Sequence, residues 1–290
     1  MHPLLVSLDL DFPGLKSVRA AYQAGDISLA LNELVAYFRA RPEPDAALLA
    51  RPDPASLHAA EVALRHEFEF YNEPGKVPGL ERFYLDIGAR DKASVGVKVG
   101  DTACFFRPFE EVGGRLVSKA MDDRVGCAVL LQVLRDLESS PHDVHVVFTV
   151  QEEVGLRGAT TSGFGVDPEV AIAVDVTDTG DTPECSPMAV HLGKGPAIKV
   201  RDSGMLAHVG VKDWLVRTAE GAGIPFQLEV LDHGTTDARA LQTTRAGVPA
   251  GCVSVPTRYI HSPSEMVDPD DVRDAVRLLV AALSGPIAIG

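Results

Sequence analysis

The chain is poor in cysteine and in basic residues. Its four cysteines, Cys104, Cys127, Cys185 and Cys252, are scattered along the sequence and form no CxxC pair. This spacing does not fit a disulfide framework or a zinc knuckle, so we expect reduced thiols in a cytoplasmic protein. The 27 Lys and Arg residues are outnumbered by 41 Asp and Glu, which gives a formal net charge of −14. This charge disfavours nucleic acid and anionic membranes as partners.

Long apolar runs and several well-known motifs are also missing. No apolar run approaches the roughly 20 residues that span a bilayer, and the first residues lack the basic and apolar regions of a signal peptide. There is no Gly-x-Ser-x-Gly elbow, no Walker loop and no Gly-x-Gly-x-x-Gly after a strand, so a serine hydrolase or a nucleotide-binding site is not favoured. The 290 residues, 46% of them hydrophobic, suffice for one large α/β domain and a smaller piece.

The pattern of apolar residues changes near residue 80. Residues 1–80 carry helical patterns separated by Pro-rich connectors, and we expect an atypical helical segment there. Further along, apolar stretches of strand length alternate with stretches of helix length. Strands are predicted at 143–151, 169–176, 196–201, 226–231 and 250–255, and helices within 119–137 and at 210–222, 237–246 and 268–283. This alternation predicts an α/β fold whose mainly parallel sheet is flanked by helices.

Two adjacent carboxylates, Glu152 and Glu153, follow the first of these predicted strands. At a strand end of an open α/β sheet they would face the crevice where ligands bind. Neighbouring carboxylates repel each other unless a cation or a shared proton lies between them. One interpretation is therefore a metal site, with one Glu as a ligand and the other as a general base. The alternative is an exposed strand end with solvated acids.

Other candidate side chains lie at comparable places. Asp122 and Asp123 precede a predicted helix, where an N-cap role is the simpler interpretation, above all for Asp123. Asp175 lies at the end of the second predicted strand, and His261 follows the last one, where a lone histidine is more often structural. Taken together, carboxylates and an imidazole at these places are the ligand set of Zn²⁺, Co²⁺ or Mn²⁺.

The sequence resembles the M42 family of metallo-aminopeptidases, which includes glutamyl, deblocking and tetrahedral aminopeptidases. The matching motifs occur in the family's order over about residues 82–285. They are Ser118-Lys-Ala-Met-Asp-Asp-Arg-Val-Gly-Cys127, Phe148-Thr-Val-Gln-Glu-Glu-Val-Gly-Leu-Arg-Gly-Ala159, Ala173-Val-Asp-Val-Thr177, Gly193-Lys-Gly-Pro-Ala197, Gly234-Thr-Thr-Asp237 and Pro256-Thr-Arg-Tyr-Ile-His-Ser-Pro263. The resemblance implies the co-catalytic zinc-peptidase fold, with a catalytic domain at 118–290 and a remnant of a β-rich dimerisation domain at 81–117.

The resemblance also implies roles for the metal-site residues. Asp122 would bridge two divalent ions, zinc or cobalt, and a cis peptide bond would join it to the next residue. Glu153 and His261 would complete the ligands of one ion, and Asp175 would belong to the other. The activity implied is hydrolysis of N-terminal residues from peptides, in a protein whose partners are its peptide substrate and further copies of the chain.

Two further residues receive roles in the same way. Glu152 would be the general base that takes a proton from the metal-bound water. Asp237 matches a family loop beside the substrate, so it would bind substrate or, alternatively, support the loop.

The sequence departs from the family at its start. Members carry an early His-x-Asp-Glu-like motif whose histidine ligates the ion that Asp175 serves, and no intact counterpart is found. His2, His58 and His66 are the candidate substitutes, although His66 lies in a predicted helix. Residues 8–41 resemble instead the helical start of heparinase II/III-type polysaccharide lyases. An alternative to an active enzyme is therefore an impaired relative that acts as a binding or assembly subunit.

Overall fold

The structure is a computed structural model that describes residues 90–91, 95–97, 101, 103–183 and 185–289. The chain separates into two compact units, residues 1–103 and 104–290, and every element below belongs to the second unit. The helical segment expected at 1–80 lies outside the described residues, and the expected domain boundaries stay predictions. Within the part that the structure describes, no helix has the length and apolar character needed to cross a membrane.

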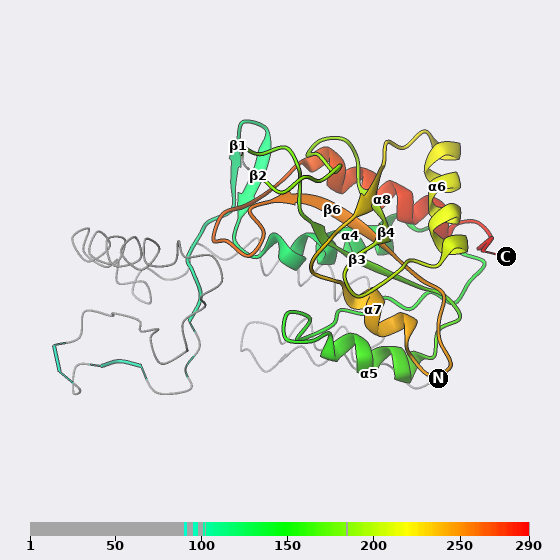
Figure 1. Ribbon diagram of the computed structural model, residues 1–290, viewed down its shortest axis with the longest axis horizontal. Helices are drawn as coiled ribbons and strands as arrows, with labels where there is room; N and C mark the ends of the chain where they lie inside the picture. Colours follow the sequence, from blue (N-terminus) through cyan, green and yellow to red (C-terminus); the bar gives the residue numbers. More distant parts are fainter. Residues whose placement is uncertain (1–89, 92–94, 98–100, 102, 184, 290) are drawn as a thin grey trace. The chain divides into compact units, whose positions relative to one another are not determined.

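A mixed sheet forms the centre of the second unit (Figure 1). Its strands are β1 (Glu110–Val112), β2 (Arg115–Ser118), β3 (Ala171–Thr177), β4 (Ala197–Arg201), β5 (Gln227–Val230), β6 (Ala250–Arg258) and β7 (Glu265–Val267). They lie in the order β1-β2-β7-β6-β4-β5, with β3 paired to β6. Parallel pairing, expected for most of the sheet, is found between β3 and β6 and between β4 and β5, whereas the other four pairs are antiparallel.

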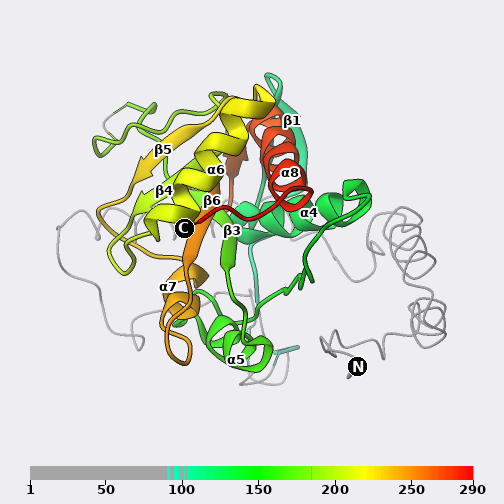
Figure 2. The ribbon, with the colours of Figure 1, turned by 90° about the vertical axis from the view of Figure 1, so that its right-hand side faces the viewer.

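Helices cover the sheet in two groups, as Figure 2 shows. They are α4 (Met121–Asp136), α5 (Arg157–Val166), α6 (Val209–Ala222), α7 (Asp237–Gln242) and α8 (Pro269–Leu283). Helix α8 packs against both α4 and α6, while α5 packs against α7. The expected α/β class, a sheet flanked by helices, is confirmed.

The two faces of the sheet bury different side chains because residues of a strand point alternately to opposite sides. Ile198, Val253 and Val255 belong to the large apolar core that α4, α6 and α8 complete. The other face of β6 carries Cys252, which packs with Ala238 of α7 in a smaller core. This second face also carries the polar side chains described below.

Residues 143–150 form no regular strand, so the strand predicted there is wrong. Val146 and Phe148 are only half-buried and Val150 is exposed. An alternating apolar pattern specifies a strand only where a neighbour accepts its backbone hydrogen bonds. Among the described residues, β3 pairs with β6 alone, and no strand pairs with residues 143–150. Glu152 and Glu153 therefore follow an unpaired segment and lie in the turn that leads into α5.

Two short elements that flank the site residues were not expected from the sequence. Helix α5 contains three glycines, Gly158, Gly163 and Gly165, which weaken a helical pattern. Strand β7 has only three residues, too few for an alternating pattern to be recognised. Both elements matter for the site, because α5 follows the Glu pair and β7 follows His261.

Candidate metal centre

Asp122, Glu153 and His261 converge at one point. Each offers one ligand atom, and these atoms all lie within 4.8 Å of one another. His261 Nε2 lies 3.2 Å from Asp122 Oδ2 and 3.2 Å from Glu153 Oε2. Ligand atoms around one tetrahedral ion with bonds of about 2 Å are separated by about 3.3 Å. The three side chains therefore fit the coordination shell of a single divalent ion.

Asp122 and Asp123 lie in the first turn of α4, and their side chains have different partners. Asp122 lies near His261, whereas Asp123 contacts its own helix. The Asp122–Asp123 peptide bond is cis, as the resemblance implied, and the backbone at both residues is non-helical. Asp123 turns toward its own helix, where its Oδ1 accepts a hydrogen bond from the backbone N–H of Gly126 at 3.0 Å. This is the contact of a capping residue, which agrees with the simpler interpretation of Asp123. A Cβ at position 126 would lie only 2.3 Å from Asp123 Oδ2, so a larger residue there would displace the Asp123 carboxylate.

A tight turn presents Glu152 and Glu153. Gln151 and Leu156 on either side of the pair have left-handed backbone angles, with φ of 60° and 55°. The N–H groups of Gly155 and Leu156 both donate to the carbonyl of Glu152, at 3.0 and 2.9 Å. Glu153 is exposed and points toward His261, while Glu152 is half-buried beside it. The two carboxylates therefore have different surroundings, as different roles would require.

Crowded acids raise one another's pKa at this site. Burial, followed by the charge of Glu153, raises the pKa of Asp122 to about 7. Burial, followed by the charges of Asp237 and Glu153, raises the pKa of Glu152 to about 7. Burial and the neighbouring carboxylate of Asp175 raise the pKa of Asp123 to about 9. Such a cluster is relieved when a cation binds among the carboxylates.

Asp175 lies next to this group, although it is not among the three converging residues. It is buried near the end of β3, and its Oδ1 accepts a hydrogen bond from the backbone N–H of Val176 at 2.8 Å. Burial raises its pKa well above the usual value, and the charges of Asp122 and Glu152 add to this effect. His2, His58 and His66, the candidates for a further ligand beside Asp175, lie outside the described residues.

Asp237 begins α7 on the same side of the sheet. Its Oδ2 accepts a hydrogen bond from Thr149 Oγ1 at 2.6 Å. Its Oδ1 is buried and has no hydrogen-bond partner among the described residues. The charge of Asp237 is a leading cause of the raised pKa of Glu152, so the two carboxylates are neighbours. A buried carboxylate oxygen without a hydrogen-bond partner calls for a partner from outside the described residues, such as an ion, a water molecule or a ligand.

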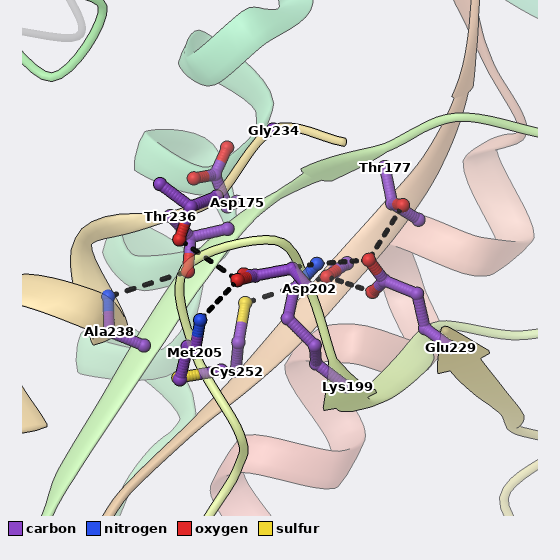
Figure 3. Close-up of polar contacts among 12 residues, drawn as sticks. Asp175, Thr177, Lys199, Asp202, Met205, Glu229, Gly234, Thr236, Ala238 and Cys252 are labelled. Atoms are coloured by element: carbon purple, nitrogen blue, oxygen red, sulfur yellow. Dashed lines mark hydrogen bonds and ion pairs between the residues drawn. The ribbon is translucent and has the colours of Figure 1, made fainter. Parts of the chain in front are cut away.

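A buried polar network lies on the strands next to Asp175 (Figure 3). Lys199 and Glu229 are fully buried and form an ion pair between β4 and β5. Glu229 also accepts hydrogen bonds from Thr177 Oγ1 at 2.9 Å and from Ser254 Oγ at 2.7 Å. Ser254 lies opposite Asp175 in the register of β6 and β3. The network thus joins four strands at the level of the Asp175 carboxylate.

The same network reaches the loop in front of Asp237. Asp202 lies 4.0 Å from the Lys199 ammonium through its Oδ2. Its Oδ1 accepts a hydrogen bond from Thr235 Oγ1 at 3.0 Å. Thr236 then caps α7 by accepting a hydrogen bond from the backbone N–H of Ala238. The residues before Asp237 are therefore connected to the buried ion pair through Asp202, which Figure 3 shows near Lys199.

One buried carboxylate near the site, Glu265, was missed by the sequence interpretation. It lies at the start of β7 and is 2% exposed. Its hydrogen bonds go to the backbone of Asp122 and His261. The available signal was its place four residues after His261 in an otherwise small and polar segment.

Comparisons with known proteins match most of the described part of the chain. The family model "M42 glutamyl aminopeptidase" matches residues 62–278, and "Heparinase II/III N-terminus" matches residues 4–77. A putative aminopeptidase of Acetivibrio thermocellus is 47% identical over 206 residues, which cover 70% of this chain and 62% of that protein. The chain thus spans less than two thirds of the length of this curated relative.

Solved structures agree with this match. An aminopeptidase from the archaeon Desulfurococcus kamchatkensis has a TM-score of 0.70 and 46% identity, with 74% of this chain and 62% of that chain covered. The TET1 peptidase of Pyrococcus horikoshii has a TM-score of 0.61 and 31% identity, with 73% and 67% covered. With the family model matching more than half of its residues, the chain belongs to the M42 glutamyl aminopeptidase family.

Proposed function

We propose that this chain is a metal-dependent aminopeptidase that hydrolyses N-terminal residues from peptides. The observation that carries the proposal is the convergence of Asp122, Glu153 and His261, whose ligand atoms lie within 4.8 Å of one another, in a chain that belongs to an aminopeptidase family. The chain spans only 62% of the length of its curated relative. The activity of a whole aminopeptidase is therefore a proposal for this chain.

The donor set fits a divalent ion, and zinc or cobalt would suit one imidazole and two carboxylates. Asp122, Glu153 and His261 would hold one ion, and Asp175 would serve a second ion through Asp122 as the shared ligand. Bound there, the metal would supply Lewis-acid chemistry, polarising the peptide carbonyl and lowering the pKa of water.

Glu152 would act as the general base. It is the neighbour of a proposed ligand in sequence, yet its carboxylate is not one of the three converging groups. A half-buried carboxylate beside the ion can take the proton of the attacking water and return it to the leaving amine. Its position next to Glu153 supports this role.

Asp237 would bind the free amino group of the substrate. Its buried Oδ1 has no hydrogen-bond partner among the described residues, while Thr149 holds the other oxygen in place. A protonated α-amino group would supply the missing donor and a compensating charge. This contact would select peptides with a free N-terminus.

Self-association and location are further proposals. The Pyrococcus horikoshii TET1 peptidase is described as able to assemble into a tetrahedron or a large octahedral shell, which supports a homo-oligomer here. All four cysteines are free, which supports a reducing, cytoplasmic compartment.

The test is hydrolysis of aminoacyl 4-nitroanilides by the full chain, measured with the metal content of the same sample. We expect activity with Zn²⁺ or Co²⁺ that is lost when a chelator removes the ion and that returns when the ion is added back. An N-acetylated version of the best substrate should not be cleaved. Turnover that persists after the ion has been removed would refute the proposal.

A further inference from the structure

A single buried carboxylate connects the backbones of two of the proposed ligands. Glu265 Oε2 accepts a hydrogen bond from the backbone N–H of Asp122 at 3.0 Å. Its Oε1 accepts a hydrogen bond from the backbone N–H of His261 at 2.8 Å. Each oxygen of Glu265 therefore binds one of the two segments that carry proposed ligands. A single side chain thus fixes the distance between these two segments.

These two N–H groups depend on a side chain because their segments are irregular. The backbone at Asp122 is non-helical, with φ of −76° and ψ of 109°, and His261 has a left-handed φ of 62°. Asp122 is extended within a helical stretch and His261 is left-handed, so neither N–H joins the hydrogen-bond ladder of a helix or a sheet, and each needs another acceptor. The Glu265 carboxylate provides it, with the added strength of a charge-assisted hydrogen bond.

Glu265 itself is held firmly by the sheet. It pairs with Ser118 of β2, and the next residues of β7 pair with β6. Its side chain is buried, since the residue is only 2% exposed. Because the backbone of Glu265 is held in the sheet, its carboxylate can fix the positions of the two less regular segments.

We propose that Glu265 is a positioning residue that holds Asp122 and His261 at the separation required for one ion. The proposal rests on the proposed function, because it assumes that these side chains bind the ion. It adds that the ligand geometry depends on a carboxylate that is not itself a ligand. Groups that orient ligands from behind typically contribute about 10- to 100-fold in metal affinity.

The informative substitution is Glu265→Gln. The amide keeps the size of the side chain but has only one acceptor oxygen, and its NH₂ group would face the second N–H donor. One of the two ligand segments must then lose its hydrogen bond. Glu265→Asp is the second variant, since it keeps the negative charge and both acceptor oxygens and only shortens the side chain by one methylene.

Asp271 offers a matched control. It is also fully buried, and its two oxygens accept hydrogen bonds from the backbone N–H groups of Gly193 and Gly195, at 2.7 Å each. Asp271→Asn therefore removes the same kind of double backbone contact at a place that holds no proposed ligand. Any loss caused merely by a weakened fold should appear in both variants.

The experiment is a titration of the metal-free full chain with Co²⁺ alone, followed by calorimetry and by the visible absorption of the bound ion. We expect Glu265→Gln to weaken Co²⁺ binding by about 10- to 100-fold and to alter the spectrum. Glu265→Asp should give a smaller loss, and Asp271→Asn should match the wild type in both readouts. Thermal unfolding of the metal-free samples measures how much each substitution lowers the Tm.

Each remaining outcome decides against the proposal. Equal Co²⁺ affinity and an equal spectrum in wild type and both Glu265 variants would refute the positioning role and leave the proposed function standing. An equal loss in Glu265→Gln and Asp271→Asn would show a general effect of stability. A wild-type chain that binds no Co²⁺ would overturn the proposed function together with this inference.

Discussion

The imidazole of His261 lies 3.2 Å from the carboxylate of Asp122, between Nε2 and Oδ2. The two residues come from distant parts of the second unit, one from the start of α4 and the other from the segment between β6 and β7. Strand β7 brings them together, since it pairs with β2 just before α4 and with β6 just before His261. The geometry of the candidate centre is thus a product of sheet pairing.

Glu152→Gln should abolish catalysis and leave metal binding intact. Loss of a general base typically lowers the rate by about 100- to 10,000-fold, whereas the amide does not disturb the three converging groups. The measurement is kcat on an aminoacyl anilide together with the metal content. Glu138→Gln, an exposed carboxylate elsewhere on the surface, serves as the control. Nearly normal turnover in the Glu152 variant would exclude the proposed base.

A divalent ion should stabilise the folded chain through His261. An ion present at 100 times its Kd raises the free energy of unfolding by about 2.7 kcal/mol if it binds only the native state. Thermal unfolding with and without Zn²⁺ should therefore show a rise in Tm for the wild type. The rise should be small in His261→Ala and unchanged in His145→Ala, whose side chain is exposed. A full rise in the His261 variant would place the ion elsewhere.

The buried pair of Lys199 and Glu229 should behave as one unit. Removing one partner leaves an uncompensated charge in the core, which typically costs about 3–5 kcal/mol. Lys199→Met and Glu229→Gln should each be strongly destabilising. The double variant should lose much less than the sum of the two, because it buries no unpaired charge. Urea unfolding measures all three variants, and additive losses would contradict this coupling.

The stability contributed by Asp181 should depend on pH. Burial opposes its ionisation, but hydrogen bonds from Arg258, Thr179 and the backbone N–H of Leu192 outweigh this effect and hold its pKa well below the usual range. A lowered folded-state pKa means that the contribution is complete above the unfolded pKa of about 3.9 and is lost as the pH falls below it. Asp181→Asn should therefore destabilise at pH 7.

The measurement is the difference in unfolding free energy between wild type and Asp181→Asn across the pH range. The difference should shrink as the pH falls below about 4. Arg258 donates to both oxygens of Asp181, at 2.9 and 2.8 Å, so Arg258→Met should show the same trend. A difference that stays constant down to acid pH would mean that the charge of Asp181 contributes nothing.

Much of the framework could be predicted from local pattern. Helix α8 follows from an Asp268 cap, a proline at its start and a long amphipathic stretch, and its observed range of Pro269–Leu283 lies close to the expected one. Strand β6 follows from a run of apolar and β-branched residues between turns. These signals suffice because the hydrogen bonds of a helix are local and because a central strand is buried on both faces.

The strand expected at 143–151 shows where local pattern fails. Its alternation is clear in the sequence, yet no strand in the described residues pairs with it. Helix α5 shows the reverse case, because Ala159 and Gly163 are buried by tertiary packing although the glycines weaken the pattern. In both places the secondary structure depends on which segments pack beside the residues. The local sequence does not specify those neighbours.

By itself, the sequence determined the residue types of the candidate site and the helices and strands that carry Asp122, Asp175 and Asp237. Only the tertiary structure decided that Asp122, Glu153 and His261 share one point, and that Glu265 holds two of their backbones. The physical reason is the range of the forces involved. Periodicity records which face of an element is buried, whereas convergence of distant side chains depends on strand pairing and on buried hydrogen bonds that form between remote parts of the chain.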